Sequence, residues 1–218
     1  MNNQKAKYAI AMIWVIIILK ILSLIIEAPL FLLNENILST DNIDQNIILV
    51  VDSISSYTAL LTLAASIISI ITFIRWFKQA YYNIELRVGK LKYSNSWTIA
   101  GWFIPIVNLF IPYEIMKDLY TKTDQYLLCH SMEPYTERLK NNYVNGWWTL
   151  WIIFLIINYW SMKIQWSSIT IETLSNSNNL LSIINTILLI VLGMTTIIVI
   201  EDYSKAEKLL AETTILTE

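Results

Sequence analysis

Few residues of this chain have the type and spacing that catalysis or metal binding requires. The most reactive pair is Cys129 with His130, the only cysteine and the only histidine in the sequence. Two adjacent residues supply neither a chelating set for a metal ion nor a nucleophile with its base in hydrogen-bonding reach. No H-E-x-x-H, G-x-S-x-G or P-loop pattern occurs either. We therefore predict no catalytic residue, no metal site, no bound cofactor and no enzymatic activity.

Lys20 is a second candidate, because it lies near the middle of the apolar run 8–26. An ionisable side chain inside a membrane is a functional hypothesis by default. In a helix, Ser23 and Glu27 would share its face at i+3 and i+7. Alternatively, the ammonium group extends to the membrane surface and pairs with Glu27 or with Asp52. Both interpretations remain open.

The third candidate is the stretch "WFIPIVNLFIPY" at 102–113, which is apolar yet holds two prolines. Four residues in and before it recur at i, i+4, i+7 and i+11, along one helical face: Gly101, Pro105, Asn108 and Pro112. A proline cannot donate to the carbonyl four residues back, and residues before proline avoid the α conformation. We predict two short helical pieces with breaks near 104 and 111, and a new helix that starts at Pro112.

Two interpretations of this proline segment remain open. The freed carbonyls and the Asn108 amide could line a site, as broken helices do in transporters. The segment could instead be a wedge that packs against neighbouring helices at their cytoplasmic end, which is the interpretation we favour.

The elements that must position these residues are four apolar runs long enough to cross a bilayer core of about 30 Å. They cover 8–26, 57–74, 147–164 and 180–200. Hydrophobic residues make up 56% of the chain and charged residues 15%, against about 25% charged in soluble domains. The mean hydropathy is +0.52. These values predict an all-α membrane protein with four transmembrane helices, in a single domain over 1–218.

Basic residues indicate which ends face the cytoplasm. Nine of the fifteen Lys and Arg residues lie in 75–146, two precede the first run and two follow the last. The loops 27–56 and 165–179 contain none. Because positive charge concentrates on the cytoplasmic side, we predict cytoplasmic termini and a cytoplasmic or interfacial segment 75–146.

The same rule constrains the proline segment. Both of its flanks are basic, so we expect 97–113 to be re-entrant or to lie flat on the membrane, without crossing it. The stretch "PYEIMKDLYTKTDQYLL" that begins at Pro112 should form an amphipathic cytoplasmic helix along the interface. Its predicted apolar side consists of Ile115, Met116, Leu119, Tyr120 and Leu127.

Hydroxyl, amide and small residues form stripes on the apolar runs. The second run carries Ser55, Thr58, Thr62, Ser66 and Ser69; the fourth carries Ser182, Asn185, Gly193 and Thr196; the third carries Asn158, Ser161 and Gln165. Such stripes could line a wet conduit, but they also let membrane helices approach and hydrogen-bond. We favour helix packing.

Two stretches resemble a known family. They are "RWFKQAYYN" at 75–83 and "SNSWTIAGWFIPIVNLFIPYEIMKDLY" at 94–120, with W-F-I-P-x-x-N-L-x-x-P-Y as the most specific part. The chain resembles the bacterial membrane family catalogued as domain of unknown function 4328. Arg75 and Trp76, which open the first stretch, join the candidate residues on this ground. The resemblance implies a multi-pass protein of the bacterial cytoplasmic membrane and implies no activity.

Two functions remain open at this point. The first is a non-enzymatic membrane protein that docks or regulates a partner through the basic segment 75–146. Its expected partners are an anionic cytoplasmic leaflet and either another protein or a second copy of the chain, and not a nucleic acid. The alternative is a small oligomeric channel or transporter with a site at the re-entrant segment.

Overall fold

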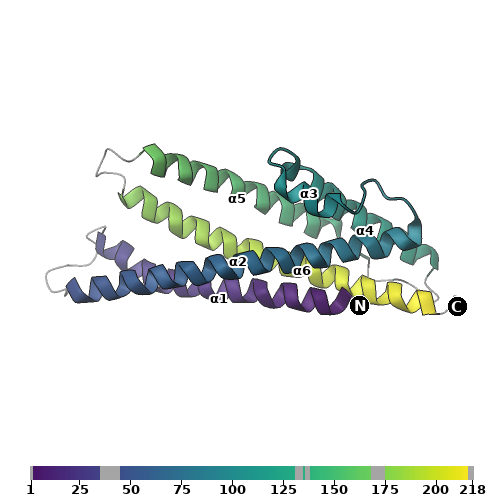
Figure 1. The fold of residues 1–218 in the computed structure, drawn as a ribbon, viewed down its shortest axis with the longest axis horizontal. Coiled ribbons are helices and arrows are strands. Elements are labelled where there is room, and N and C mark those ends of the chain that lie inside the picture. The colour runs from purple at the N-terminus through teal and green to yellow at the C-terminus, as the bar shows by residue number, and fades with distance from the viewer. Residues whose placement is uncertain (1, 35–44, 131–134, 136–137, 168–174, 216–218) are drawn as a thin grey trace. The chain divides into compact units, whose positions relative to one another are not determined.

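Every regular element that the described residues form is a helix in the computed structural model of the chain (Figure 1). The structure describes residues 2–34, 45–130, 135, 138–167 and 175–215. The elements are α1 (Asn2–Asn34), α2 (Gln45–Val88), α3 (Trp97–Phe103), the short 3₁₀ helix η1 (Val107–Leu109), α4 (Ile111–His130), α5 (Asn141–Ser167) and α6 (Ser175–Ile215).

Each predicted apolar run lies inside one long helix, but the helices continue well past the runs. α2 has 44 residues and α6 has 41, whereas about 20 residues cross a bilayer core. Much of the expected loop 27–56 is therefore helical, and so is the stretch that follows 57–74. α2 ends at Val88, and the next residue is Gly89, whose φ of 80° is unfavourable for other residues and whose N–H donates to the carbonyl of Glu85 at 2.9 Å.

Three of the described helical segments are long and apolar enough to cross a membrane: Asn2–Ile26, Leu49–Val88 and Leu181–Glu212. The bent pair of Trp97–Phe103 and Val107–His130 would be a fourth if it were one span. α5, which contains the predicted run 147–164, is not among them, because its tryptophan, tyrosine and asparagine residues lower its hydropathy. The expectation of four spans is therefore met only in part.

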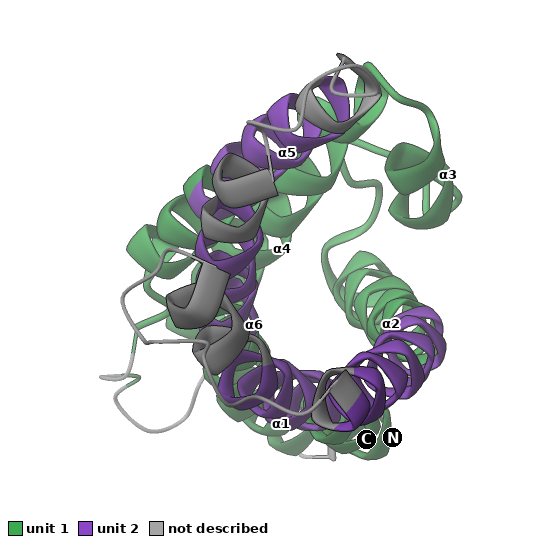
Figure 2. Ribbon diagram, turned by 90° about the vertical axis from the view of Figure 1, so that its left-hand side faces the viewer, with its two compact units in different colours: residues 1–12, 68–149, 195–218 green, residues 13–67, 150–194 purple. Residues whose placement is uncertain are grey.

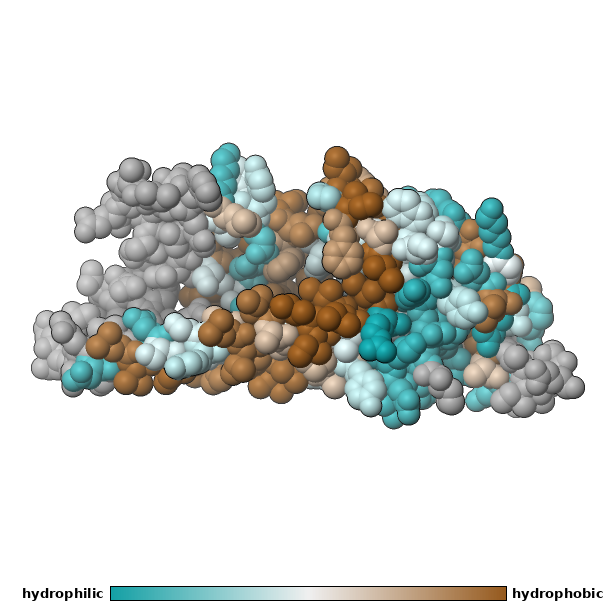
Figure 3. Space-filling model, viewed as in Figure 1, coloured by the Kyte–Doolittle hydropathy of each residue, from teal (hydrophilic) through white to brown (hydrophobic). Residues whose placement is uncertain are grey.

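Brown apolar atoms are exposed along the middle of α2 in Figure 3.

The chain divides into two compact units (Figure 2). Unit 2 comprises Ile13–Ile67 and Leu150–Met194. Two of its hydroxyls donate to carbonyls of their own helix, Thr62 to Thr58 at 2.8 Å and Ser66 to Thr62 at 2.7 Å. The amides of Asn158 on α5 and Asn185 on α6 donate to each other at 3.2 and 3.1 Å. These hydrogen bonds serve helix structure and helix pairing.

Unit 1 comprises Met1–Met12, Ile68–Thr149 and Thr195–Glu218. It contains large side chains with no exposed surface at all, among them Trp76, Phe77, Tyr81, Ile84, Ile115, Met116, Leu119, Tyr120, Leu127, Ile200 and Tyr203. These residues come from α2, α4 and α6. Unit 1 therefore has a packed core of its own, which the expectation of a mainly interfacial cytoplasmic segment did not include.

Gly193 permits a close approach of α6 to α1 within unit 2. A Cβ atom at this position would lie 3.1 Å from Ile17 Cγ1 and 3.4 Å from Ile13 Cγ2. We expect Gly193→Leu to destabilise the protein by about 1–3 kcal/mol, because the added atoms overpack this contact. The measurement is the thermal unfolding midpoint of the purified protein in detergent. Gly146→Leu is the matched control, since a Cβ at Gly146 meets nothing within 4 Å; equal midpoints for the two variants would contradict the close contact.

Candidate functional site

The proline segment turns sharply between α3 and α4. α3 ends at Phe103, and Ile104, the residue before Pro105, is extended with φ −91° and ψ 114°. The helical direction bends by 109° between Trp97–Phe103 and Val107–His130. The predicted break near 104 is therefore confirmed, and α4 begins at Ile111, one residue before the predicted start.

The expectation that four candidate residues share one helical face is wrong, because the helix does not continue through Pro105. Gly101 and Pro112 are buried, Asn108 is half-buried and Pro105 is exposed. A Cβ at Gly101 would lie 3.0 Å from Ile111 Cγ2, so this glycine lets α3 pack closely on the start of α4. Asn108 Oδ1 is buried without a hydrogen-bond partner among the described residues. The outer side of the turn exposes large apolar side chains, with Phe103 68% and Ile106 76% exposed.

Trp102 connects this segment to the core of unit 1. Its ring packs edge-on against Phe73 and Phe77 of α2, with centroids 5.7 and 6.3 Å apart, and against Trp147 and Trp148 of α5, both at 6.3 Å. Aromatic pairs in such geometries stabilise by about 0.5–1.5 kcal/mol beyond their burial. Aromatic packing thus holds the proline segment against α2 and α5 in unit 1.

α4 uses its apolar side within the protein. All five residues predicted on that side are fully buried: Ile115, Met116, Leu119, Tyr120 and Leu127. Their side is therefore covered by protein, which corrects the expectation that this side lies along the membrane interface.

Two ion pairs link α4 to the segments that precede and follow it in the chain. Lys92 Nζ donates to Glu114 Oε2 at 2.6 Å, and this hydrogen bond raises the pKa of Lys92. Asp124 is buried and accepts from Arg138 at 2.5 Å and from the Leu139 N–H at 3.3 Å. The guanidinium and the backbone donor offset part of the cost of burying this carboxylate.

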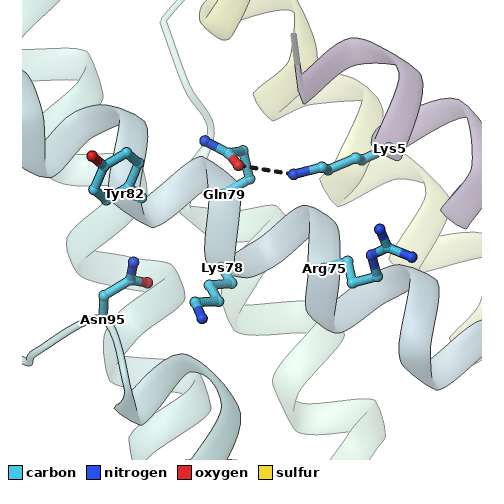
Figure 4. A pocket seen from close by; sticks show the side chains of 6 residues that line it. All are labelled: Lys5, Arg75, Lys78, Gln79, Tyr82 and Asn95. Carbon is cyan, nitrogen blue, oxygen red and sulfur yellow. Dashed lines mark hydrogen bonds between the residues drawn. The ribbon is translucent and has the colours of Figure 1, made fainter.

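Arg75 lies at a basic cavity on unit 1. The cavity has a volume of about 400 Å³ and is lined by Lys5, Arg75, Lys78, Gln79, Tyr82 and Asn95. Figure 4 shows that four of these side chains come from α2, with Lys5 from α1 and Asn95 from the segment before α3. Three of the lining side chains are cationic, and none of the described side chains that line the cavity is acidic. Trp76, the neighbour of Arg75, is fully buried.

A chain of hydrogen bonds leads from this cavity to a carboxylate on α6. Lys5 Nζ donates to Gln79 Oε1 at 2.8 Å, and Gln79 Nε2 donates to Asn83 Oδ1 at 2.9 Å. Asn83 Nδ2 then donates to Glu207 Oε1 at 2.7 Å. Asn2 Nδ2 lies 3.1 Å from both Glu207 oxygens and 3.3 Å from the carbonyl of Trp76. The network joins α1, α2 and α6 and fixes the position of Lys5.

The other candidates lie apart from this cavity. Lys20 is a half-buried residue of unit 2, and the described residues form no ion pair between it and Asp52; the side chain of Glu27 lies outside the described residues. Cys129 is exposed, and His130 stacks on Tyr126 with centroids 4.2 Å apart. Within the described ranges, no three His, Cys, Asp or Glu residues are grouped as metal ligands.

Sequence reasoning missed Lys5, Gln79, Asn83 and Glu207 as parts of one site. A partial signal was present, because Gln79 and Asn83 lie four residues apart within the stretch 75–83 that Arg75 opens. Nothing local indicated that Asn2 and Glu207, at opposite ends of the chain, meet there.

Glu207 provides a test of the network. We expect Glu207→Leu to destabilise the protein by about 1–3 kcal/mol, because the amides of Asn2 and Asn83 lose their shared acceptor. Glu212→Leu, at an exposed position of the same helix, should change stability by less than about 0.5 kcal/mol. Thermal unfolding in detergent measures both. A Glu207 variant as stable as the Glu212 variant would show that the network does not hold the three helices.

The comparison with known proteins agrees with the two stretches that first suggested a family. The model of a family described as a domain of unknown function (DUF4328) matches residues 39–205. No curated protein and no solved structure matches the chain. The matched range includes the stretch 75–83, the whole proline segment and α4, and it covers well over half of the sequence. This chain therefore belongs to the DUF4328 family.

Proposed function

We propose that this protein is a non-enzymatic, multi-pass protein of the bacterial cytoplasmic membrane that docks a partner on unit 1. The observation that carries the proposal is the complete burial of Ile115, Met116 and Leu119 in the segment 75–146. A simple connection between two spans needs no core of its own. A folded body with charged residues outside provides a fixed surface that a partner can recognise.

The surface of unit 1 supports docking. A hollow of about 810 Å³ lies along α6 and the start of α5, and its lining mixes both signs of charge. Its charged residues are Arg138, Lys140, Lys205, Lys208, Glu201, Asp202 and Glu212. Mixed charges at the rim of a contact favour specificity for one partner over others.

The membrane placement rests on charge and on exposed apolar residues. Thirteen of the fifteen basic residues fall in segments assigned to the cytoplasm. The apolar outer side of the proline segment, including Phe103 and Ile106, would be covered if that turn dipped into the cytoplasmic leaflet. Exposed apolar surface of this kind is typical of membrane contact.

The alternative of an oligomeric channel draws less support. It relied on polar stripes, yet Thr62 and Ser66 donate within their own helix and Asn158 pairs with Asn185. Helix packing explains these contacts without a conduit.

Reporter fusions test the orientation. Fusions after residues 45, 92, 140, 172 and 218 should read outside, inside, inside, outside and inside, because the basic segments stay in the cytoplasm. An outside signal at 140 would make the proline segment a true span and remove unit 1 from the cytoplasm.

A photoreactive residue in place of Tyr143 or Leu209 tests the docking. Both residues line the hollow and are 36% exposed. We expect one discrete adduct from cells at these positions and none at Tyr159 or Met162, exposed residues of unit 2 that serve as controls. An adduct of twice the mass of the chain would identify a second copy as the partner. The absence of adducts at both hollow positions, or the same adducts at the controls, would contradict docking on this surface.

A further inference from the structure

The cavity at Arg75 concentrates positive charge without a counter-charge. Arg75 and Lys78 lie three residues apart on α2 and are both exposed, and Lys5 faces the same space from α1 (Figure 4). Within the described part of the chain, neither Arg75 nor Lys78 forms an ion pair with a carboxylate. Like charges at this spacing repel each other on a helix, so a bound anion would relieve an existing cost.

Lys5 is held for such a contact. Gln79 and Asn83 connect it to Glu207, as described above, and this network keeps its ammonium group at the cavity. An ammonium group has three donors, and one of those on Lys5 is engaged by Gln79. Among the described residues its other donors have no hydrogen-bond partner, so they are available to a ligand. Tyr82 and Asn95 add neutral polar groups to the lining.

An apolar surface leads directly to the cavity along α2. Ile68, Ile71, Arg75, Lys78 and Tyr82 follow one another at spacings of three or four residues, so they share one helical face. The two isoleucines are 48% and 51% exposed. Figure 3 shows brown atoms along α2 that give way to teal atoms toward its C-terminal end. The order of apolar and then cationic groups matches the acyl chains and headgroup of a phospholipid.

We propose that this cavity binds the phosphate of an anionic phospholipid, with the acyl chains along Ile68 and Ile71. The guanidinium of Arg75 can hold two phosphate oxygens in a bidentate contact, and the two lysines contribute point charges. Free phosphate shares the headgroup chemistry but makes no use of the apolar face. The assignment to the cytoplasmic leaflet, though not the binding itself, rests on the proposed function.

Titration of the full-length protein in detergent tests the proposal. Short-chain phosphatidylglycerol, phosphatidylcholine and inorganic phosphate are added separately, and binding is followed by the shift of the thermal unfolding midpoint. We expect saturable binding of phosphatidylglycerol, at least about tenfold weaker binding of phosphatidylcholine because its headgroup carries no net charge, and weak binding of phosphate.

Two sets of variants assign the binding to the cavity. Arg75→Gln with Lys78→Gln should weaken phosphatidylglycerol binding at least about tenfold, because two charged contacts are removed. Lys90→Gln with Lys117→Gln removes the same charge from exposed positions elsewhere and should change it less than about twofold. Ile71→Ser should weaken the binding of phosphatidylglycerol and leave that of phosphate unchanged.

Several outcomes would overturn the proposal. These are equal binding of phosphatidylglycerol and phosphatidylcholine, binding of phosphate alone, or the same loss in both double variants. All exchanged residues are exposed, and the midpoint without ligand verifies that each variant folds. Because the titration is done in detergent, it does not depend on orientation; an outside reading at residue 92 would refute the proposed function while leaving the binding result intact.

Discussion

Three helices of unit 1 share a single carboxylate. Glu207 of α6 receives the amide of Asn83 from α2 and the amide of Asn2 from α1, and Asn2 also lies within reach of the Trp76 carbonyl. Removing a carboxylate from water costs free energy unless donors replace the water, so these hydrogen bonds favour the convergence of the three helix ends around the half-buried Glu207. The aromatic residues Trp76 and Tyr203 then pack edge-on against each other, with centroids 6.1 Å apart. The position of Lys5 at the cavity follows from the same convergence.

The sequence predicted the architecture where local patterns determine it. Apolar runs longer than 17 residues can form only long helices, and each lies in one. Proline chemistry predicted the break after Phe103, and the spacing of Ile115, Met116 and Leu119 predicted which side of α4 is buried. The same reasoning could not predict what covers that side, since the bilayer and the protein's own core both favour apolar residues. The burial of Asp124 was equally hidden from local patterns, because its partner Arg138 is not on its helix.

The candidate site was the least predictable part. Arg75 was singled out by resemblance alone, and its neighbours Lys5 and Asn95 are brought to it by folding across long sequence separations. Charges that are distant in sequence cannot be grouped by their spacing. Gly101, Pro105, Asn108 and Pro112 could be grouped in this way, but the helix ends at Phe103, so they do not share one face. Residues at helical spacing share a face only as long as the helix continues. Here the proline that belongs to the pattern also ends the helix.

The reciprocal amide pair of Asn158 and Asn185 has a consequence for how the last two long helices assemble. Without Asn185, the Asn158 amide would keep only the bond from its Nδ2 to the Phe154 carbonyl, at 2.8 Å, whereas the two asparagines together also satisfy each other's side-chain oxygen. A slip of α5 against α6 by one turn would separate them, so the pair sets the register of this helical hairpin. The two positions are expected to tolerate change only jointly, since an apolar residue at both is less disruptive than an apolar residue at one.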